Sequence, residues 1–425
     1  MSTAYMRRWT MASKWDVIVV GGGAAGMFSA GVAAERRLRV LLLERNRDMG
    51  KKLRITGKGR CNVLNDCGPE NVLKNVPTGS RFLYSSVYGF PPEETKKFFE
   101  KIGVPLKRER GDRVFPQSDR AADVVAALEQ WMRNQGVEIR RGRVRRLLVE
   151  NGTLMGVWTE SETFYAPQVI LATGGMSYPA TGSTGDGYGL AAQVGHTVVA
   201  PSGSLVPLEV EGGCRELAGL SLRNTGLTLW GSRKKPVYQD FGELLFMSYG
   251  MSGPTVLSAS AHMQEKDGPY RVELDLKPAL DEAKLDARLL RDFGERKNDK
   301  IMQGLRGLLP AQLVPVILDR CAISADQPVH DVTKQQRREI LHQLKHLTFA
   351  ITGKRPVEEA IVTHGGVKVS EVNPRTMESK KLSGLHFAGE ILDCDAYTGG
   401  FNLQIAWSTG YAAGTSCGNR GESVV

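Results

Sequence analysis

The hydrophobic pattern at the start of the chain predicts a strand, a tight turn, a helix and a second strand. Residues 16–20 (DVIVV) form a short β-branched run, which is typical of a buried parallel strand. Residues 24–36 are mostly small and apolar and predict a helix, and residues 39–43 (RVLLL) predict another buried strand. This order indicates the β–α–β unit of an α/β fold with a parallel sheet.

Two later apolar runs predict further strands of the same sheet. Residues 168–171 (QVIL) and 385–390 (LHFAGE) each end in small residues, and an Ala-rich helix follows the second run, from about residue 398 through 411. The chain is therefore expected to return to its first domain near its C-terminus.

The residues between these runs have a different pattern. Alternating segments at 227–230 and 271–276 predict antiparallel strands, with glycines at the turns. Leucine and phenylalanine at helical spacing then predict helices within 285–293 and 341–347, and β character returns at 360–370. We expect an insert with boundaries near residues 200 and 370.

The first turn has the spacing Gly21-x-Gly23-x-x-Gly26. Gly21 permits the tight turn, Gly23 lets the backbone approach a pyrophosphate, and Gly26 lets helix and strand pack closely. The helix begins at Ala24 and Ala25, where free N–H groups and the positive end of the helix dipole favour phosphate. The pattern predicts a dinucleotide site.

The remaining strand ends favour FAD over NAD as the dinucleotide. Glu44 ends the second strand, 18 residues after Gly26, where an acid can accept hydrogen bonds from a ribose. A Gly-acid pair near the C-terminus can bond the ribityl chain, and the helix N-terminus after it can face the flavin. No second GxGxxG is present, so a separate NAD(P)H domain is not expected. The residues predicted to bind FAD at these later strand ends are Ala172, Thr173, Gly174, Gly175, Gly389, Glu390, Asp393, Gly399, Gly400, Phe401, Asn402 and Leu403.

Composition excludes several classes of protein. Hydrophobic residues make up 41% and charged residues 24%, which is ordinary for a globular protein and excludes a disordered, collagen-like or multi-span membrane chain. The uncharged run at 17–34 is interrupted by five glycines, so it fits a strand–turn–helix better than a membrane span. The six cysteines form no CxxC motif and no histidine pair has metal-ligand spacing, so we expect no metal site and reduced thiols in the cytoplasm.

The net charge of +10 favours an anionic partner such as a nucleotide, RNA or a membrane surface. Ten basic and three acidic residues lie between Glu35 and Asn62, and a second basic cluster spans 133–146. Such clusters suit phosphate binding, although a solvated basic face is the alternative for the second one.

Several longer motifs resemble the HI0933-like family of bacterial flavoproteins. They include DVIVVGGGAAGM at 16–27, GKKLRITGKGRCNVLN at 50–65, DRVFPQSDRAADVVAAL at 112–128 and AGEILDCDAYTGGFNLQIAWSTGYAAG at 388–414. The Gly-Arg-Cys-Asn and Thr-Gly-Gly-Phe-Asn-Leu-Gln blocks are much more specific than GxGxxG. Lys58 stands where the family usually has glycine, and Met247-Ser248 stands where it usually has Thr-His.

The resemblance implies an α/β fold: a two-dinucleotide-binding, Rossmann-like FAD domain interrupted by a β-barrel and a small helical bundle. The expected segments are a flexible extension at 1–14, FAD-domain parts at 15–200 and 371–425, barrel parts at 201–279 and 353–370, and helices at 280–352. The resemblance also adds these residues to the FAD site: Arg45, Lys51, Lys52, Thr56, Gly57, Gly59, Arg60, Cys61, Asn62 and Val144.

Family members reduce activated double bonds: some reduce steroid-like enones in bile-acid metabolism, and others are linked to reduction of a uridine in large-subunit ribosomal RNA. Both reactions add hydride to the β-carbon of a C=C–C=O unit and a proton to the α-carbon. Because an apolar bile acid does not explain the net charge of +10, we expect ribosomal RNA as the partner, without stable membrane association, and NAD(P)H as a transient electron donor. Two alternatives remain: a reductase of a small, steroid-like conjugated enone, and a flavoprotein that does not turn over, such as a redox sensor or a ribosome assembly factor.

Two residues are candidate proton donors. Cys61 follows a run of cations that should lower its pKa and expose it, and packing against the flavin is the alternative. His364 precedes Gly365-Gly366 and can approach the flavin, or it can be a packed histidine. Tyr178 and Tyr397 flank predicted flavin segments, and Cys394, between two aspartates, is expected to be structural.

Overall fold

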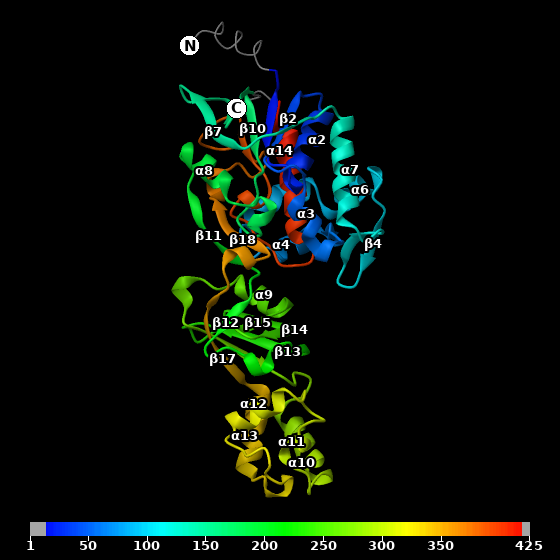
Figure 1. The fold of residues 1–425 in the computed structure, drawn as a ribbon, viewed down its shortest axis with the longest axis vertical. Helices are drawn as coiled ribbons and strands as arrows, with labels where there is room; N and C mark the ends of the chain where they lie inside the picture. Colours follow the sequence, from blue (N-terminus) through cyan, green and yellow to red (C-terminus); the bar gives the residue numbers. More distant parts are fainter. Residues whose placement is uncertain (1–13, 419–425) are drawn as a thin grey trace. The chain divides into compact units, whose positions relative to one another are not determined.

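The computed structural model describes residues 14–418, so the predicted extension lies outside the described residues except for Lys14. These residues form two compact units, 14–204 with 357–418 and 205–356 (Figure 1). The mixed α/β Rossmann fold with a barrel insert is therefore confirmed.

A parallel five-stranded sheet is the centre of the first unit. Its strand order is β19-β10-β1-β2-β6. Val20 lies opposite Leu43 on one side and Leu171 on the other, so neighbouring strands end level with one another. Four strands lie close to the predicted runs: β1 Val17–Val20, β2 Val40–Glu44, β10 Gln168–Leu171 and β19 Leu385–Phe387. The fifth, β6 Glu138–Arg141, was not predicted.

Two helices lie side by side against the sheet in Figure 1: α2 (Ala24–Glu35) and α14 (Phe401–Ser416). A Cβ added to Gly410 would lie 2.9 Å from the Ala25 carbonyl oxygen, and one added to Gly414 would lie 2.7 Å from that of Ser29. The small residues of α14 thus permit close packing on α2. Helix α7 (Ala121–Asn134) covers α2 at Gly31, where the Trp131 ring fills the space of a side chain.

Smaller elements complete the first unit. The segment 51–101 contains α3 (Lys51–Ile55), η1 (Thr56–Gly59), β3 (Leu64–Asn65), α4 (Pro69–Lys74), α5 (Ser80–Gly89) and α6 (Pro92–Lys101). Strands β4 (Leu106–Glu109) and β5 (Arg113–Pro116) form a small sheet with β3. Strands β7 (Val144–Glu150), β8 (Thr153–Thr159) and β9 (Thr163–Tyr165) form a separate antiparallel sheet, and α8 spans Asp186–Gln193.

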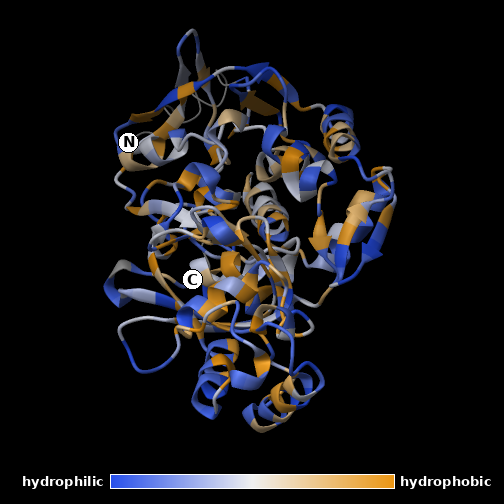
Figure 2. Ribbon diagram, turned by 60° about the horizontal axis from the view of Figure 1, so that its bottom comes forward, coloured by the Kyte–Doolittle hydropathy of each residue, from blue (hydrophilic) through white to orange (hydrophobic). Residues whose placement is uncertain are grey.

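The second unit contains a closed barrel of strand order β12-β15-β14-β13-β16-β17. Its strands are β12 Leu208–Val210, β13 Ser221–Trp230, β14 Tyr238–Met247, β15 Gly250–Ser252, β16 Tyr270–Asp275 and β17 Leu347–Lys354, with α9 at Pro254–Ser260. The helices are α10 Glu282–Glu295, α11 Ile301–Gly304, α12 Leu313–Arg320 and α13 Lys334–Lys345. Leu285, Leu289 and Phe293 of α10 are buried, which matches the two-faced colouring of the helices in Figure 2.

The end of the insert differs from the expected segments. Strand β17 begins at Leu347, inside the segment expected to be helical, and pairs with β12 and β16 to close the barrel. Strand β18 (Val362–Val367), expected in the barrel, pairs instead with β11 (Val198–Ser204) of the first unit. The second boundary therefore falls at 356/357 rather than near 370.

The uncharged run at 17–34 forms β1 and most of α2. Within residues 14–418, no helix is long and apolar enough to cross a membrane.

Candidate active site

The predicted cofactor residues converge at the carboxyl edge of the parallel sheet. Because the strands are parallel and end level, the residues after β1, β2, β10 and β19 meet there. These are the Gly21–Gly26 turn, Glu44, the 172–175 segment and the 388–390 segment. This edge is where open α/β sheets bind ligands.

The geometry of the first turn matches the roles predicted for its three glycines. Gly21 has φ +106°, and a Cβ there would lie 2.5 Å from the Ala172 carbonyl oxygen. A Cβ at Gly26 would lie 1.8 Å from the Gly21 carbonyl oxygen, so any side chain would force strand and helix apart. At Gly23, by contrast, a Cβ would meet no atom of the described residues within 4 Å. Gly23 is also the N-cap of α2, and no side chain of residues 14–418 caps that helix. The N-terminus of α2 therefore has open space and free N–H groups for a phosphate.

Glu44 is buried and held by the backbone. One carboxylate oxygen accepts the Gly22 N–H at 2.6 Å and the other accepts the Asn46 N–H at 2.7 Å. A carboxylate oxygen has more than one acceptor position, so these bonds orient Glu44 and leave capacity for a ribose hydroxyl.

Glu390 is the centre of a polar cluster that joins four segments. Its carboxylate accepts from Lys52 Nζ at 2.7 and 2.9 Å, from the Thr363 N–H at 2.9 Å and from the Ser177 hydroxyl at 3.2 Å. Thr363 Oγ1 in turn accepts the backbone N–H groups of Met176 and Ser177. Lys52 and Glu390, both predicted as cofactor ligands, are thus ion-paired with each other.

Two other predicted cofactor residues are also engaged by protein carboxylates. Arg45 forms an ion pair of 3.0 Å with Asp186 at the start of α8. Arg60 pairs with Glu109 and with Asp119, and its guanidinium lies 4.2 Å from the centroid of the Phe115 ring. Their charge is therefore largely neutralised before any ligand binds.

The prediction that Cys61 is an exposed thiol of lowered pKa is wrong. Cys61 has 0% exposure, and burial raises the pKa of its thiol to about 12, an effect only partly opposed by a hydrogen bond with Thr56. The neighbouring cations do not reverse this, because the Arg60 charge is paired and Lys58 is exposed. The thiol is protonated at neutral pH and packed inside the protein.

Three buried polar atoms at the site have no protein partner. The side-chain oxygens Asn62 Oδ1, Thr173 Oγ1 and Asp393 Oδ1 are buried and form no hydrogen bond within the described part of the chain. Burial raises the pKa of Asp393. Unsatisfied buried oxygens are costly, and they fit a ligand that presents many hydrogen-bonding groups, as FAD does.

The N-terminus of α14 is the second helix start in this region, and its N-cap glycine packs on the backbone of Leu64. Its N-cap, Gly400, has φ +101°, and no side chain of the described residues caps the helix. Asn65 donates to the Gly399 carbonyl at 3.1 Å, which places the segment after Asn62 beside this helix end. Asn402 holds the approaching loop by accepting the Ala396 N–H and donating to its carbonyl oxygen. The helix end can stabilise negative charge on a flavin.

His364 lies in a buried acid–base arrangement. Its Nδ1 is 3.0 Å from Asp395 Oδ1, and Asp395 is 0% exposed while the His364 side chain is 29% exposed. Ser204 donates to the other Asp395 oxygen at 2.6 Å. Thr78 Oγ1 lies 3.4 Å from the same ring nitrogen. Asp395 can therefore orient His364 and stabilise its protonated form.

Five residues of these two clusters were not predicted from the sequence: Thr78, Ser177, Ser204, Thr363 and Asp395. Thr363 precedes His364, and Asp395 follows Cys394 in Asp-Cys-Asp, but neither pattern indicates its partner. Of the tyrosines considered, Tyr178 has φ +53° and is 37% exposed at the start of η2 (Pro179–Thr181), and Tyr397 donates its N–H to the Asn75 carbonyl.

The remaining predicted residues are distributed over this region. Val144 is buried in β7, and Gly57 lies in a left-handed turn of η1. The others lie in α3 and η1 (Lys51, Thr56 and Gly59), after β10 (Ala172, Gly174 and Gly175), in η8, which spans Gly389–Ile391 (Gly389), and in α14 (Phe401 and Leu403).

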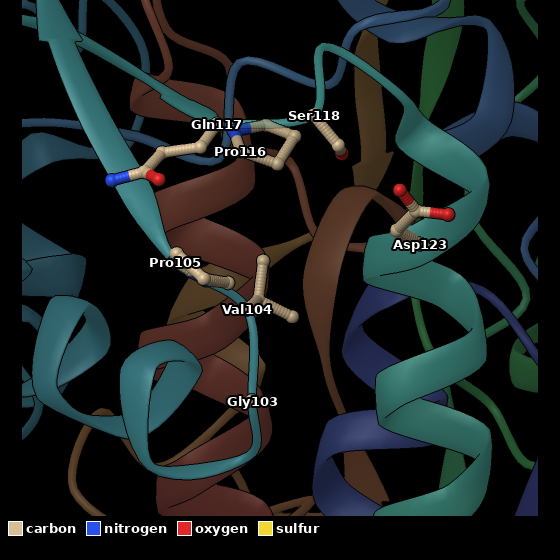
Figure 3. Close-up of a pocket in the computed structure, with 7 residues that line it drawn as sticks. All are labelled: Gly103, Val104, Pro105, Pro116, Gln117, Ser118 and Asp123. Carbon is tan, nitrogen blue, oxygen red and sulfur yellow. The ribbon is translucent and has the colours of Figure 1, made fainter.

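A surface pocket of about 390 Å³ is lined by none of the predicted cofactor residues (Figure 3). It is bounded by the loop before β4, the end of β5 and the first turn of α7, and is lined by Gly103, Val104, Pro105, Pro116, Gln117, Ser118 and Asp123. Asp123 is the charged residue in this lining.

Ion pairing reduces the charge predicted for the first basic cluster. Of its ten basic residues, Arg39, Arg45, Lys52, Arg54 and Arg60 pair with acids, and Arg36 donates to backbone carbonyls. Arg37, Arg47, Lys51 and Lys58 form no ion pair with residues 14–418. In the second cluster, Arg140, Arg143 and Arg145 are paired. A count of basic residues in the sequence therefore overestimates the positive charge that is not paired with an acid.

Metal-binding groups are not found: within residues 14–418, no three His, Cys, Asp or Glu side chains are arranged to hold an ion.

Comparison with known proteins gives a family and relatives that align over nearly the whole chain. The model of the HI0933-like protein Rossmann domain matches residues 15–416. The 3-dehydro-bile acid delta(4,6)-reductase of Clostridium scindens is 31% identical over 410 residues, covering 95% of this chain and 98% of that protein. The ribosomal RNA dihydrouridine synthase of Haemophilus influenzae is 29% identical over 418 residues, covering 96% and 99%. A solved 3-ketosteroid-delta4-(5alpha)-dehydrogenase from Rhodococcus jostii aligns over 97% of this chain and 99% of its own, with a TM-score of 0.49 and 15% identity.

Proposed function

Because the chain belongs to the HI0933-like family, whose members are FAD-dependent oxidoreductases, we propose that it reduces a uridine of large-subunit ribosomal RNA to dihydrouridine, with NAD(P)H as electron donor. The ribosomal RNA dihydrouridine synthases of Haemophilus influenzae and Escherichia coli, 29% and 28% identical over nearly the whole chain, support this substrate. Such a substrate places the reaction in the cytoplasm.

The overall reaction consumes NAD(P)H and one proton. The uridine C5=C6 double bond is reduced: a hydride equivalent adds to C6, the β-carbon of the C4 carbonyl, and a proton adds to C5, the α-carbon. NAD(P)H is oxidised to NAD(P)⁺. When bound, FAD supplies the two-electron chemistry that links donor and substrate.

The chain's own residues divide the binding of the cofactor. The α2 N-terminus and Gly23 are suited to the pyrophosphate, and Glu44 to the adenosine ribose. The unpartnered oxygens of Asn62, Thr173 and Asp393 supply further hydrogen bonds. The N-terminus of α14 stabilises negative charge.

The His364–Asp395 pair is the observation that carries the proposed chemistry. Reduction of a conjugated double bond needs a proton at the α-carbon, and a partly exposed histidine held by a buried carboxylate is a suitable donor. Cys61 is the weaker candidate because it is fully buried and its pKa is raised to about 12. We assign His364 the role of proton donor and Asp395 that of positioning residue.

Mass spectrometry of ribosomal RNA tests the substrate. We expect a strain without this gene to lose one dihydrouridine of large-subunit RNA, and a plasmid copy to restore it. Unchanged dihydrouridine would favour a small conjugated enone, the substrate class named for the 31% identical relative.

Cofactor analysis and absorption spectroscopy test the redox function. The purified protein should contain FAD rather than FMN, and Glu44→Ala should retain less of it, because the carboxylate that bonds the Gly22 and Asn46 N–H groups and is suited to the ribose is lost. Glu162→Ala, at an exposed position, is the control. NAD(P)H should bleach the flavin and substrate should restore its colour. Bleaching without recovery by RNA or enone would favour a non-catalytic redox sensor.

A further inference from the structure

Two exposed tyrosines of α5 stack on each other. Tyr84 and Tyr88 are 55% and 39% exposed, their ring centroids are 4.4 Å apart and the rings are inclined by 28°. They are one helical turn apart, so both project from the same side of α5. Unlike a single exposed aromatic residue, a stacked pair presents a continuous aromatic surface whose outer ring face is open to a further ring.

The helix that carries these tyrosines begins at the candidate active site. Thr78, just before α5, contacts His364 Nδ1 at 3.4 Å and forms a β-bridge with Asp395. A Cβ added to Gly79, the N-cap of α5, would lie 2.4 Å from Cys394 Sγ, so the helix start is packed directly on this segment. At about 1.5 Å per residue, Tyr84 and Tyr88 lie roughly 6 and 12 Å along the axis from Ser80. Stacked bases about 3.4 Å apart would cover that span with roughly two to four nucleotides.

The charged residues near the tyrosines indicate at which end of α5 a polyanion would bind. Lys74, at the end of α4, and Arg81, in the first turn of α5, are exposed and form no ion pair within the described residues. The Ser80 hydroxyl donates to the Leu73 carbonyl, which holds these two helix ends together. Glu70, at the other end of α4, is close enough to Tyr88 to act on its hydroxyl electrostatically. The cationic end of the α4–α5 pair is thus the end beside His364.

We propose that Tyr84 and Tyr88 are a stacking platform for single-stranded RNA next to the reduced uridine, with Lys74 and Arg81 contacting its phosphates. This inference rests on the proposed RNA substrate and adds the residues that bind the strand. A base continues the tyrosine stack on its open ring face, while the two cations neutralise the backbone between the platform and His364. Aromatic stacking with adjacent cations is how proteins hold single strands without reading their sequence.

Fluorescence anisotropy with a labelled single-stranded oligouridine tests the platform. We expect the double variant Tyr84→Ala/Tyr88→Ala to weaken binding by roughly 10- to 100-fold, as loss of base stacking does. Tyr84→Phe/Tyr88→Phe should bind within about twofold of the wild type, because the rings remain. Tyr165→Ala, which removes an exposed tyrosine of β9, is the matched control and should bind like the wild type. Flavin content and thermal unfolding establish that each variant is folded.

Salt dependence separates the tyrosines from the cations. The slope of log Kd against log salt should be unchanged in the alanine double variant and should fall by about 0.7 in Arg81→Gln, the value for one phosphate contact on a single strand. If the alanine variant binds RNA as tightly as the wild type, the platform is overturned and the RNA substrate stands. If the wild-type enzyme binds no RNA but reduces an enone, the proposed substrate is overturned and the platform with it.

Discussion

At the scale of single residues, burial sets the chemistry of the candidate proton donors more than the charge of neighbouring residues does. Cys61 follows several cations in the sequence, yet it is enclosed and its pKa is raised to about 12. His364 has an ordinary surrounding sequence, yet it meets a buried carboxylate 31 residues away. Cys61, which the sequence favoured as the proton donor, is therefore less suitable for that role than His364.

Replacing His364 should separate the two half-reactions. We expect His364→Gln to lower the rate of substrate reduction by at least about 100-fold, because one positioned general acid is lost. Reduction of the flavin by NAD(P)H needs no substrate acid and should continue. Stopped-flow absorbance of each half-reaction measures both rates.

Two further variants complete that test. Asp395→Asn should give a smaller loss, because the imidazole remains but loses its carboxylate partner. His330→Gln, at an exposed histidine of the second unit, should behave as the wild type. Equal substrate rates in His364→Gln and the wild type would assign the proton to another group, with Cys61→Ala as the next variant.

The buried thiol of Cys61 predicts a loss of stability at alkaline pH. Its folded pKa is raised from about 9 to about 12, so the folded state keeps a proton that the unfolded state releases between these values. Cys61 thus contributes stability that is fully present below pH 9 and is lost as pH rises towards 12. Between pH 8 and pH 10 the loss should be about 1.4 kcal/mol.

Urea unfolding at pH 8 and pH 10 measures this contribution. Cys61→Ser should show a pH dependence smaller by about that amount, since a serine hydroxyl does not titrate in this range. Cys67→Ser should also reduce the pH dependence over this interval, because the pKa of Cys67 is raised to about 11, which is above pH 10. Rapid alkylation of Cys61 in the native protein at pH 8 would contradict a buried, protonated thiol.

At the scale of elements, the site is built around the N-termini of two helices. Helices α2 and α14 pack closely because small residues face each other, and both begin with uncapped N-termini within residues 14–418. The Lys52–Glu390 cluster then joins α3, the loop after β10, β18 and η8. The sequence pattern predicted most of these elements, since β-branched runs and turn glycines act locally. It did not predict that β18 would leave the barrel, because strand pairing depends on distant partners.

Two glycine substitutions should have effects of opposite sign. Gly410→Ala should destabilise the protein by about 1–3 kcal/mol, because the added Cβ would lie 2.9 Å from the Ala25 carbonyl oxygen and force α14 from α2. Gly189→Ala in α8 should stabilise it by about 0.5–1 kcal/mol, because no described atom lies within 4 Å of the new Cβ and alanine favours a helix. Chemical unfolding measures both, and a stabilised Gly410→Ala would refute the close contact.

At the scale of the whole molecule, ion pairs neutralise many of the basic residues that the sequence places in the first cluster, so fewer of them can attract an anion than the net charge of +10 suggests. Many basic residues of the first cluster pair with acids from other segments, such as Arg45 with Asp186 and Lys52 with Glu390. Lys52 is therefore a poor position for testing RNA binding, because its reversal would break the Glu390 cluster. Arg47, Lys51 and Lys58, which form no ion pair within residues 14–418, are better positions.

Charge reversal at these positions should weaken RNA binding through its salt dependence. We expect Arg47→Glu with Lys58→Glu to lower the affinity for ribosomal RNA and to reduce the log–log salt slope by up to about 0.7 for each single-strand phosphate that is no longer neutralised. Arg306→Glu with Lys297→Glu makes the same change in net charge at exposed residues of the second unit and is the matched control. Equal slopes in both double variants would show that net charge, rather than this cluster, attracts the RNA.

The sequence by itself determined the β–α–β start, the glycine turn and the late return of the chain to the sheet. These features follow from local rules, because glycine spacing, β-branched runs and helical periodicity act over a few residues. The tertiary structure alone decided which side chains meet: Lys52 reaches Glu390 across 338 positions, and Ser204 reaches Asp395 across 191. It also decided that Cys61 is buried. Burial and pairing depend on segments far apart in the chain, and a local pattern does not encode them.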